Sequence, residues 1–177
     1  MAEQGRAGLT ALRGNAVTLL GPGLKPGDKA PDFQTVAQDL STVGLADSAG
    51  KARMLISVPS LDTPVCSLET VRFNREVAGL GDRAQVYVIS KDLPFAQKRF
   101  CGAEGIENVQ TLSDFRESSF GRAYGVLIGD GPLAGILARA IFVVDPSNTI
   151  RYVQIVPEIS QEPNYDEALN ALRAAAG

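Results

Sequence analysis

Apolar and polar positions along the chain fall into short blocks, most of them the length of a β-strand. Predominantly apolar runs at 54–58, 85–90 and 135–144 are typical of strands buried on both faces of a sheet. Apolar residues at helical spacing follow the first run, from 64 to about 80, and close the chain at 165–176. Shorter strands are predicted at 16–20, 33–36, 41–45, 109–112 and 150–155, and shorter helices at 95–100 and 118–124. This order predicts an α/β fold, with a mixed β-sheet flanked by helices.

The length of 177 residues suits one domain with a sound core. Residues 1–14 are small, polar and weakly charged, and are predicted to form a loose N-terminal extension ahead of a single domain at 15–177. They lack the apolar core of a secretory signal, and no apolar run approaches the roughly 20 residues that span a bilayer. We therefore expect a cytoplasmic protein with no membrane partner.

Charge and residue usage exclude several classes of function. The net charge of -3 argues against nucleic acid as a partner, because phosphate binding requires a basic patch. The chain has no histidine, so Ser-His-Asp and Cys-His machinery is absent. Its two cysteines, Cys66 and Cys101, form no CxxC pair, and no nucleotide-binding glycine motif occurs. We expect neither a metal nor a cofactor.

Cys66 stands where a buried strand gives way to a helix. Thr63 is a favourable N-cap residue, Pro64 suits the first helical position, and Cys66 then becomes the third helical residue. Its sulfur would lie among free amide groups at the positive end of the helix dipole, which favours the thiolate. A lone cysteine is most often a small buried hydrophobe, but open α/β sheets place their sites at such junctions.

Arg139 is the second unusual residue, because it interrupts the apolar run 135–144. It lies either at an edge with its side chain reaching water, or buried against an anion. A buried thiolate needs a cation, so Arg139 is the expected partner of Cys66. Arg72 and Arg75, farther along the helix, are expected to be solvated.

The roles of Cys101, Asp62 and Glu69 are less clearly indicated by the sequence. Cys101 is either core filler or a redox partner, and its neighbours do not choose between the two. Asp62 and Glu69 flank Cys66, and a carboxylate close to the sulfur would oppose a thiolate. Both are therefore expected to point away from it, with Asp62 helping to cap the helix.

These residues resemble the peroxiredoxins. Pro59, Thr63 and Cys66 match the PxxxTxxC signature of that family, and Arg139 matches its distant catalytic arginine. More narrowly, the chain is similar to the bacterial thiol peroxidases, an atypical two-cysteine subgroup, from about residue 13 to the end. The stretches that carry this similarity are 14–15, 17–19, 27–33, 59–66, 73–74, 100–102, 123–126 and 162–165.

The resemblance implies a thioredoxin-like fold with an N-terminal β-hairpin, assembled as a homodimer. It also implies a thioredoxin-dependent peroxidase, an antioxidant enzyme acting on hydrogen peroxide and on alkyl or lipid hydroperoxides. Cys66 would be the peroxidatic cysteine and Cys101 the resolving cysteine of the same chain.

We expect the Cys66 thiolate to attack the hydroperoxide and become a sulfenic acid, which Cys101 converts to an intramolecular disulfide. Arg139 would stabilise the leaving oxygen, Thr63 would hold the attacking oxygen, and Pro59 would shield the sulfur. Because the cysteines lie on separate helices, both segments should partly unwind to form the bridge.

Two other functions share parts of this chemistry. A thiol–disulfide oxidoreductase would normally carry a CxxC motif, and here position 69 is glutamate. A peroxide sensor would share the first chemical step, and only repeated turnover separates it from an enzyme.

Overall fold

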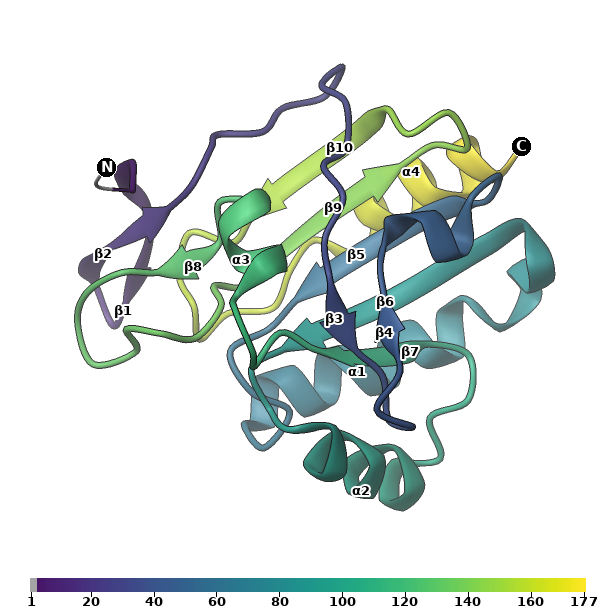
Figure 1. Ribbon diagram of the computed structural model, residues 1–177, viewed down its shortest axis with the longest axis horizontal. Coiled ribbons are helices and arrows are strands. Elements are labelled where there is room, and N and C mark those ends of the chain that lie inside the picture. The colour runs from purple at the N-terminus through teal and green to yellow at the C-terminus, as the bar shows by residue number, and fades with distance from the viewer. Residues whose placement is uncertain (1–2) are drawn as a thin grey trace.

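The strand β5 (Ala52–Ser57) runs through the middle of the molecule and is buried along its whole length. The computed structural model describes residues 3–177 and arranges them as a large mixed sheet with a smaller sheet beside it (Figure 1). The other strands are β1 (Gly5–Leu12), β2 (Asn15–Leu20), β3 (Thr35–Val36), β4 (Thr42–Val43), β6 (Ala84–Ser90), β7 (Gln110–Ser113), β8 (Leu127–Ile128), β9 (Ala140–Val144) and β10 (Ile150–Ile155). The helices are α1 (Pro64–Glu76), α2 (Pro94–Glu104), α3 (Ser119–Ala123) and α4 (Tyr165–Ala176), with 3₁₀ turns at Leu45–Ser48 and Ala78–Arg83.

The large sheet has the strand order β10-β9-β5-β6-β7-β3-β4. Strand β5 pairs in parallel with β6, and β6 with β7, while β9 runs antiparallel to both β5 and β10. The predicted mixed sheet is confirmed, and its arrangement is thioredoxin-like.

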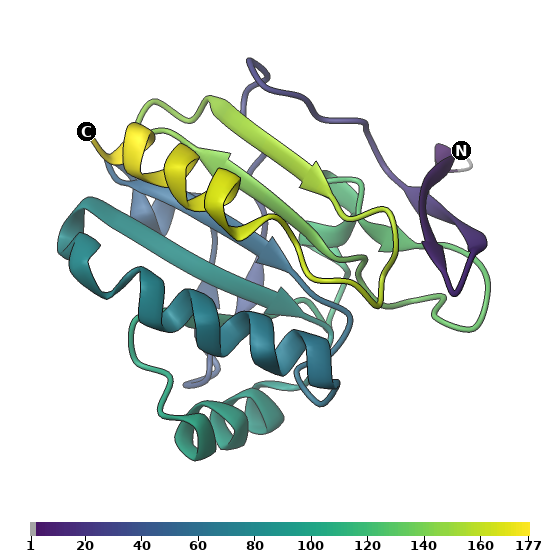
Figure 2. The ribbon, with the colours of Figure 1, turned by 180° about the vertical axis from the view of Figure 1, so that it is seen from behind.

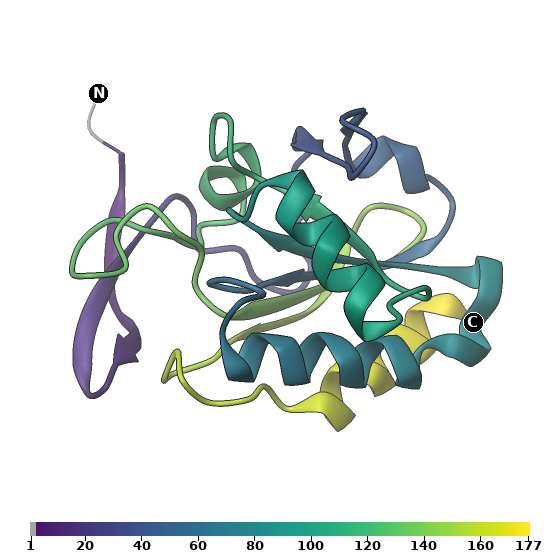
Figure 3. The same ribbon diagram turned by 90° about the horizontal axis from the view of Figure 1, so that it is seen from below.

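The two faces of this sheet are covered by different layers. Helices α1 and α4 lie across one face, where Phe73 and Leu169 join Met54 and Ile56 in one core (Figures 2 and 3). Leu55 points to the opposite face and joins a second core that contains α3 and an aromatic cluster. This alternation along β5 is the period of two expected of a strand buried on both sides.

The N-terminal residues are more ordered than the sequence indicates. Residues 5–12 form β1, which pairs antiparallel with β2, and β2 pairs in turn with β8. Arg13 and Gly14 form the turn, with φ values of 50° and 81°, the left-handed pair that two-residue hairpins favour. The prediction of a loose extension over 1–14 is therefore wrong for β1, and Met1 and Ala2 lie outside the described residues.

The strand predicted at 135–144 begins only at Ala140. The preceding residues instead cross toward the small sheet, where Leu137 bridges Leu127 and the Ala138 amide bonds to the Val126 carbonyl at 2.8 Å. Arg139 thus lies one residue before β9 rather than inside a strand. Between residues 3 and 177, no helix is long and apolar enough to cross a bilayer.

Candidate active site

Cys66 lies in the first turn of α1, at the carboxyl end of β5, and is fully buried. As expected, Thr63 is the N-cap residue with an extended backbone and Pro64 is the first helical residue. The Thr63 hydroxyl, however, makes no capping bond to the helix, and it donates to the Ser60 carbonyl at 2.8 Å. The first intrahelical bond runs from the Ser67 amide to the Thr63 carbonyl at 3.0 Å, so the amides of Val65 and Cys66 precede it.

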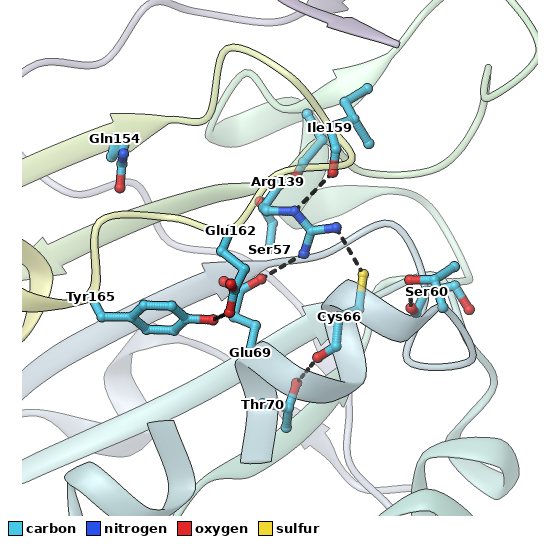
Figure 4. A network of polar contacts seen from close by, with 12 residues as sticks. Ser57, Ser60, Cys66, Glu69, Thr70, Arg139, Gln154, Ile159, Glu162 and Tyr165 are labelled. Atoms are coloured by element: carbon cyan, nitrogen blue, oxygen red, sulfur yellow. Dashed lines mark hydrogen bonds and ion pairs between the residues drawn. The ribbon is translucent and has the colours of Figure 1, made fainter. Parts of the chain in front are cut away.

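The Arg139 side chain is only 2% exposed and reaches the sulfur directly (Figure 4). Its Nη2 donates to Cys66 Sγ at 3.3 Å, and its Nε donates to the Ile159 carbonyl at 2.9 Å. The edge position with a solvated guanidinium is therefore wrong, and the pairing of Arg139 with Cys66 is present. Burial lowers the pKa of Arg139, but its anionic neighbours outweigh that effect and the pKa is raised overall.

Glu69 is the third member of this group, and the expectation that it points away is wrong. Its side chain is fully buried, and its Oε2 accepts a bond of 2.6 Å from Nη1 of Arg139. A buried guanidinium has more donors than one sulfur can satisfy, so it recruits the carboxyl one helical turn beyond Cys66. Burial raises the pKa of Glu69 to about 7, against the opposing effect of Arg139.

Asp62 does not cap the helix. It is exposed, with one oxygen 3.8 Å from the Arg99 guanidinium. The loop before α1 is held instead by Asp92, whose carboxylate accepts bonds from the Ser60 hydroxyl at 2.7 Å and the Leu61 amide at 2.8 Å. Asp92 follows β6 at the same edge of the sheet, and that position is the one sequence signal that points to it.

Hydrogen bonds to the main chain fix the segment that carries Arg139. The Ser57 hydroxyl donates to the Ala138 carbonyl at 2.7 Å, and the Val156 amide donates to the Arg139 carbonyl at 3.0 Å. The backbone from which the Arg139 side chain starts is therefore held in place.

The N-terminal hairpin supports the loop that receives Arg139. The Ala11 amide donates to the Pro157 carbonyl, and the Ile159 amide donates back to the Ala11 carbonyl, each at 2.9 Å. The Glu158 carboxylate accepts the turn amides of Arg13 and Gly14 at 2.9 and 3.2 Å. Strand β1 thus takes part in positioning the Ile159 carbonyl, an acceptor of Arg139.

Cys101 lies within α2, is 8% exposed and is not bonded to Cys66. Its sulfur lies 3.6 Å from the Thr111 hydroxyl, and burial raises the pKa of its thiol. The helix ends at Gly105, which adopts the left-handed conformation with φ of 65°. The structure therefore holds two separate, buried thiols.

Pro59, Arg72 and Arg75 are the remaining residues singled out in the sequence. Pro59 is buried just after β5, in the loop that leads to Cys66. Arg72 is half-buried with its guanidinium 3.9 Å above the Tyr165 ring, so its predicted solvation is wrong, whereas Arg75 is exposed. In residues 3–177, no three His, Cys, Asp or Glu side chains gather as metal ligands.

The comparisons with known proteins agree with this geometry. The family model Redoxin matches residues 25–169. A thiol peroxidase of Leptospira interrogans is 55% identical over 166 residues, which cover 93% of this chain and 96% of that protein. A thiol peroxidase of Aquifex aeolicus is 51% identical over 162 residues, covering 92% and 95% of the two chains. The crystal structure of a peroxiredoxin-like protein from Aquifex aeolicus has a TM-score of 0.90 and 48% identity, covering 98% and 99%. From its fold, its buried Cys66–Arg139 pair and these relatives, the chain belongs to the thiol peroxidases, within the peroxiredoxins.

Proposed function

We propose that this protein is a thiol-dependent peroxidase in which Cys66 reduces hydroperoxides. The observation that carries the proposal is the bond of 3.3 Å from the buried Arg139 guanidinium to Cys66 Sγ. A buried cation aimed at a sulfur favours the anionic form of that sulfur, which is its nucleophilic form.

In the first step the thiolate attacks the terminal oxygen of the hydroperoxide. The O–O bond breaks, Cys66 becomes a sulfenic acid, and the leaving oxygen takes up a proton as an alcohol or water. Arg139 and the amides of Val65 and Cys66 are donors for the charge that grows on the leaving oxygen. Thr63 donates to Ser60 and keeps lone pairs with which to accept a bond from the peroxide, and Pro59 shields the site from water.

In the second step the Cys101 thiol attacks the sulfenic sulfur, expels water and forms the Cys66–Cys101 disulfide. Each sulfur starts inside its own helix, so the first turn of α1 and the Cys101 segment of α2 unwind to meet. Gly102 and the left-handed Gly105 ease that change in α2.

The reductant we propose is thioredoxin, which reopens the disulfide by thiol exchange. The substrates are hydrogen peroxide and alkyl or lipid hydroperoxides, and the assembly is a homodimer. A reducing compartment such as the cytoplasm suits this cycle, and that location stays a prediction.

Intact-mass measurement after one equivalent of peroxide tests the cycle. The wild type should lose two hydrogens, with both cysteines then blocked to alkylation. Cys101→Ser should gain one oxygen on Cys66, and Cys66→Ser should leave Cys101 free. A wild-type product that gains one oxygen, with Cys101 still free, contradicts the intramolecular bridge.

A peroxide sensor is the second candidate, because it shares the sulfenic acid and the disulfide. With thioredoxin, its reductase and excess peroxide, an enzyme consumes many equivalents per chain and a sensor consumes one. Consumption that stops after one equivalent in the wild type rules out the peroxidase.

A further inference from the structure

One oxygen in the buried active-site cluster has no partner. Oε2 of Glu69 bonds to Arg139, but Oε1 is buried without a hydrogen-bond partner. An unpaired buried acceptor next to a guanidinium is costly, and the cost disappears if that oxygen carries a proton and donates it. Such a proton needs an acceptor close to Oε1 of Glu69.

The group that faces Glu69 is Glu162, in the segment just before α4. Figure 4 shows the Glu162 side chain directed toward the Glu69 carboxyl group, with the Tyr165 phenol alongside. The Tyr165 hydroxyl donates to Glu162 Oε1 at 2.6 Å. Tyr165 is itself held between the Arg72 guanidinium, 3.9 Å above its ring, and Phe73, at 5.1 Å between ring centroids.

The charges around Glu69 do not balance if every acid is ionised. Cys66 and Glu69 share the one buried guanidinium of Arg139, and Glu162 brings a further carboxylate to the far side of Glu69. Arg72 lies beyond the Tyr165 ring. Two anions on one cation, with a third anion behind, favour keeping a proton on one of the acids.

We propose that Glu162 is a positioning residue of the active site: the protonated Oε1 of Glu69 donates to the Glu162 carboxylate, which leaves the charge of Arg139 to Cys66. This inference rests on the proposed peroxidase. Tyr165 fixes the acceptor by occupying the other side of Glu162. The upward shift in the pKa of Glu69, to which Glu162 contributes, agrees with this arrangement.

In this arrangement the buried Glu69 carboxyl group holds a proton at the active site, although the chain has no histidine. While the Glu69–Glu162 pair keeps its proton, a Cys66 thiolate is the one buried anion bonded to Arg139. Glu162 is exposed, so it connects the pair to solvent. Loss of the shared proton at higher pH turns Glu69 into a competitor of Cys66 for the guanidinium.

Two measurements on the reduced full-length protein test this. The first is the carbon-13 resonance of the Glu69 carboxyl group, titrated without peroxide and assigned by its absence in Glu69→Gln. The second is the single-turnover rate with hydrogen peroxide from pH 5 to pH 9. In Glu162→Gln the Glu69 titration and the high-pH decline of the rate should both move down by about one pH unit. The rate in the declining range should then fall by up to about tenfold.

Glu167→Gln is the matched control. It removes the same charge from the same end of α4, but Glu167 contacts the Tyr152 hydroxyl at 3.3 Å instead of Tyr165. It should leave both curves in place. When Glu69→Gln is already present, adding Glu162→Gln should no longer move the pH profile of the rate. The titrating carboxyl group of Glu69, whose proton Glu162 stabilises, is then absent.

An unchanged Glu69 titration in Glu162→Gln, or an equal shift in Glu167→Gln, overturns the shared proton. A shifted titration with an unmoved rate profile overturns the link to Cys66. The titration is read without turnover, so failure of the peroxidase itself would show separately, as absent peroxide consumption with the titration shift intact.

Discussion

Replacement of Arg139 separates what the guanidinium does for folding from what it does for the sulfur. The Arg139→Met variant loses bonds to Ile159, Glu69 and Cys66 and leaves three buried acceptors without this donor. Removing one partner of a buried pair costs about 3–5 kcal/mol, so the free energy of unfolding should fall by about that amount. The double variant Arg139→Met/Glu69→Leu makes the pair apolar and should recover most of the loss.

Peroxide reactivity should not recover with stability. The bond from Arg139 to Cys66 is assisted by charge, and such bonds contribute about 1.5–3 kcal/mol, or roughly 10- to 100-fold in rate. Both variants should therefore react with hydrogen peroxide at least about tenfold more slowly than the wild type.

Urea denaturation followed by far-ultraviolet circular dichroism gives the stabilities, since the chain has no tryptophan. A competition assay for peroxide gives the rates. Arg75→Met, on the exposed side of α1, is the control and should change stability by less than about 0.5 kcal/mol. A double variant that stays as unstable as Arg139→Met refutes the pair's structural role. A double variant with wild-type reactivity refutes Arg139 as the donor to the sulfur.

Three further outcomes follow from the same contacts. Relative to Glu69→Gln, the wild type should lose about 3 kcal/mol of unfolding free energy as the pH rises from about 4.5 to about 7. The raised pKa of Glu69 means that the folded state holds its proton longer than the unfolded chain, and urea titrations that give a constant difference contradict this. In the reduced protein, Cys101 should be alkylated at least about tenfold more slowly than in urea, because burial shields the thiol and raises its pKa, and equal rates would refute that. Asp92→Asn should lower stability by about 1–3 kcal/mol and slow the peroxide reaction through the loosened Ser60 loop, whereas exposed Asp82→Asn should do neither.

The sequence predicts this fold well where burial leaves a strong pattern. The apolar runs of β5 and β6 and the closing helix α4 are recognisable because each buries a continuous face. Strand β1 leaves no such pattern, because its residues are mostly exposed or half-exposed and only Thr10 is buried when β1 pairs with β2. Only tertiary pairing makes it a strand.

The pairing of Cys66 with Arg139 follows from the sequence because each residue is costly to bury without the other. The prediction that Glu69 points away is wrong for a related reason. The sulfur disfavours a nearby carboxylate, but the remaining donors of the Arg139 guanidinium bind one. The ring contact of Arg72 and the anchor at Asp92 depend on which loops meet in space, which spacing along the chain does not reveal.

The hydrogen bonds between β1 and the loop at 157–159 have a consequence for biosynthesis. Ala11 is translated well before Pro157 and Ile159, its partners in that loop. The Ile159 amide cannot bond to the Ala11 carbonyl until the loop at 157–159 has emerged from the ribosome. A nascent chain that stops short of this loop therefore carries Cys66 in an unfinished pocket, and its sulfur acquires its final surroundings only when Ile159 meets Ala11 and Arg139.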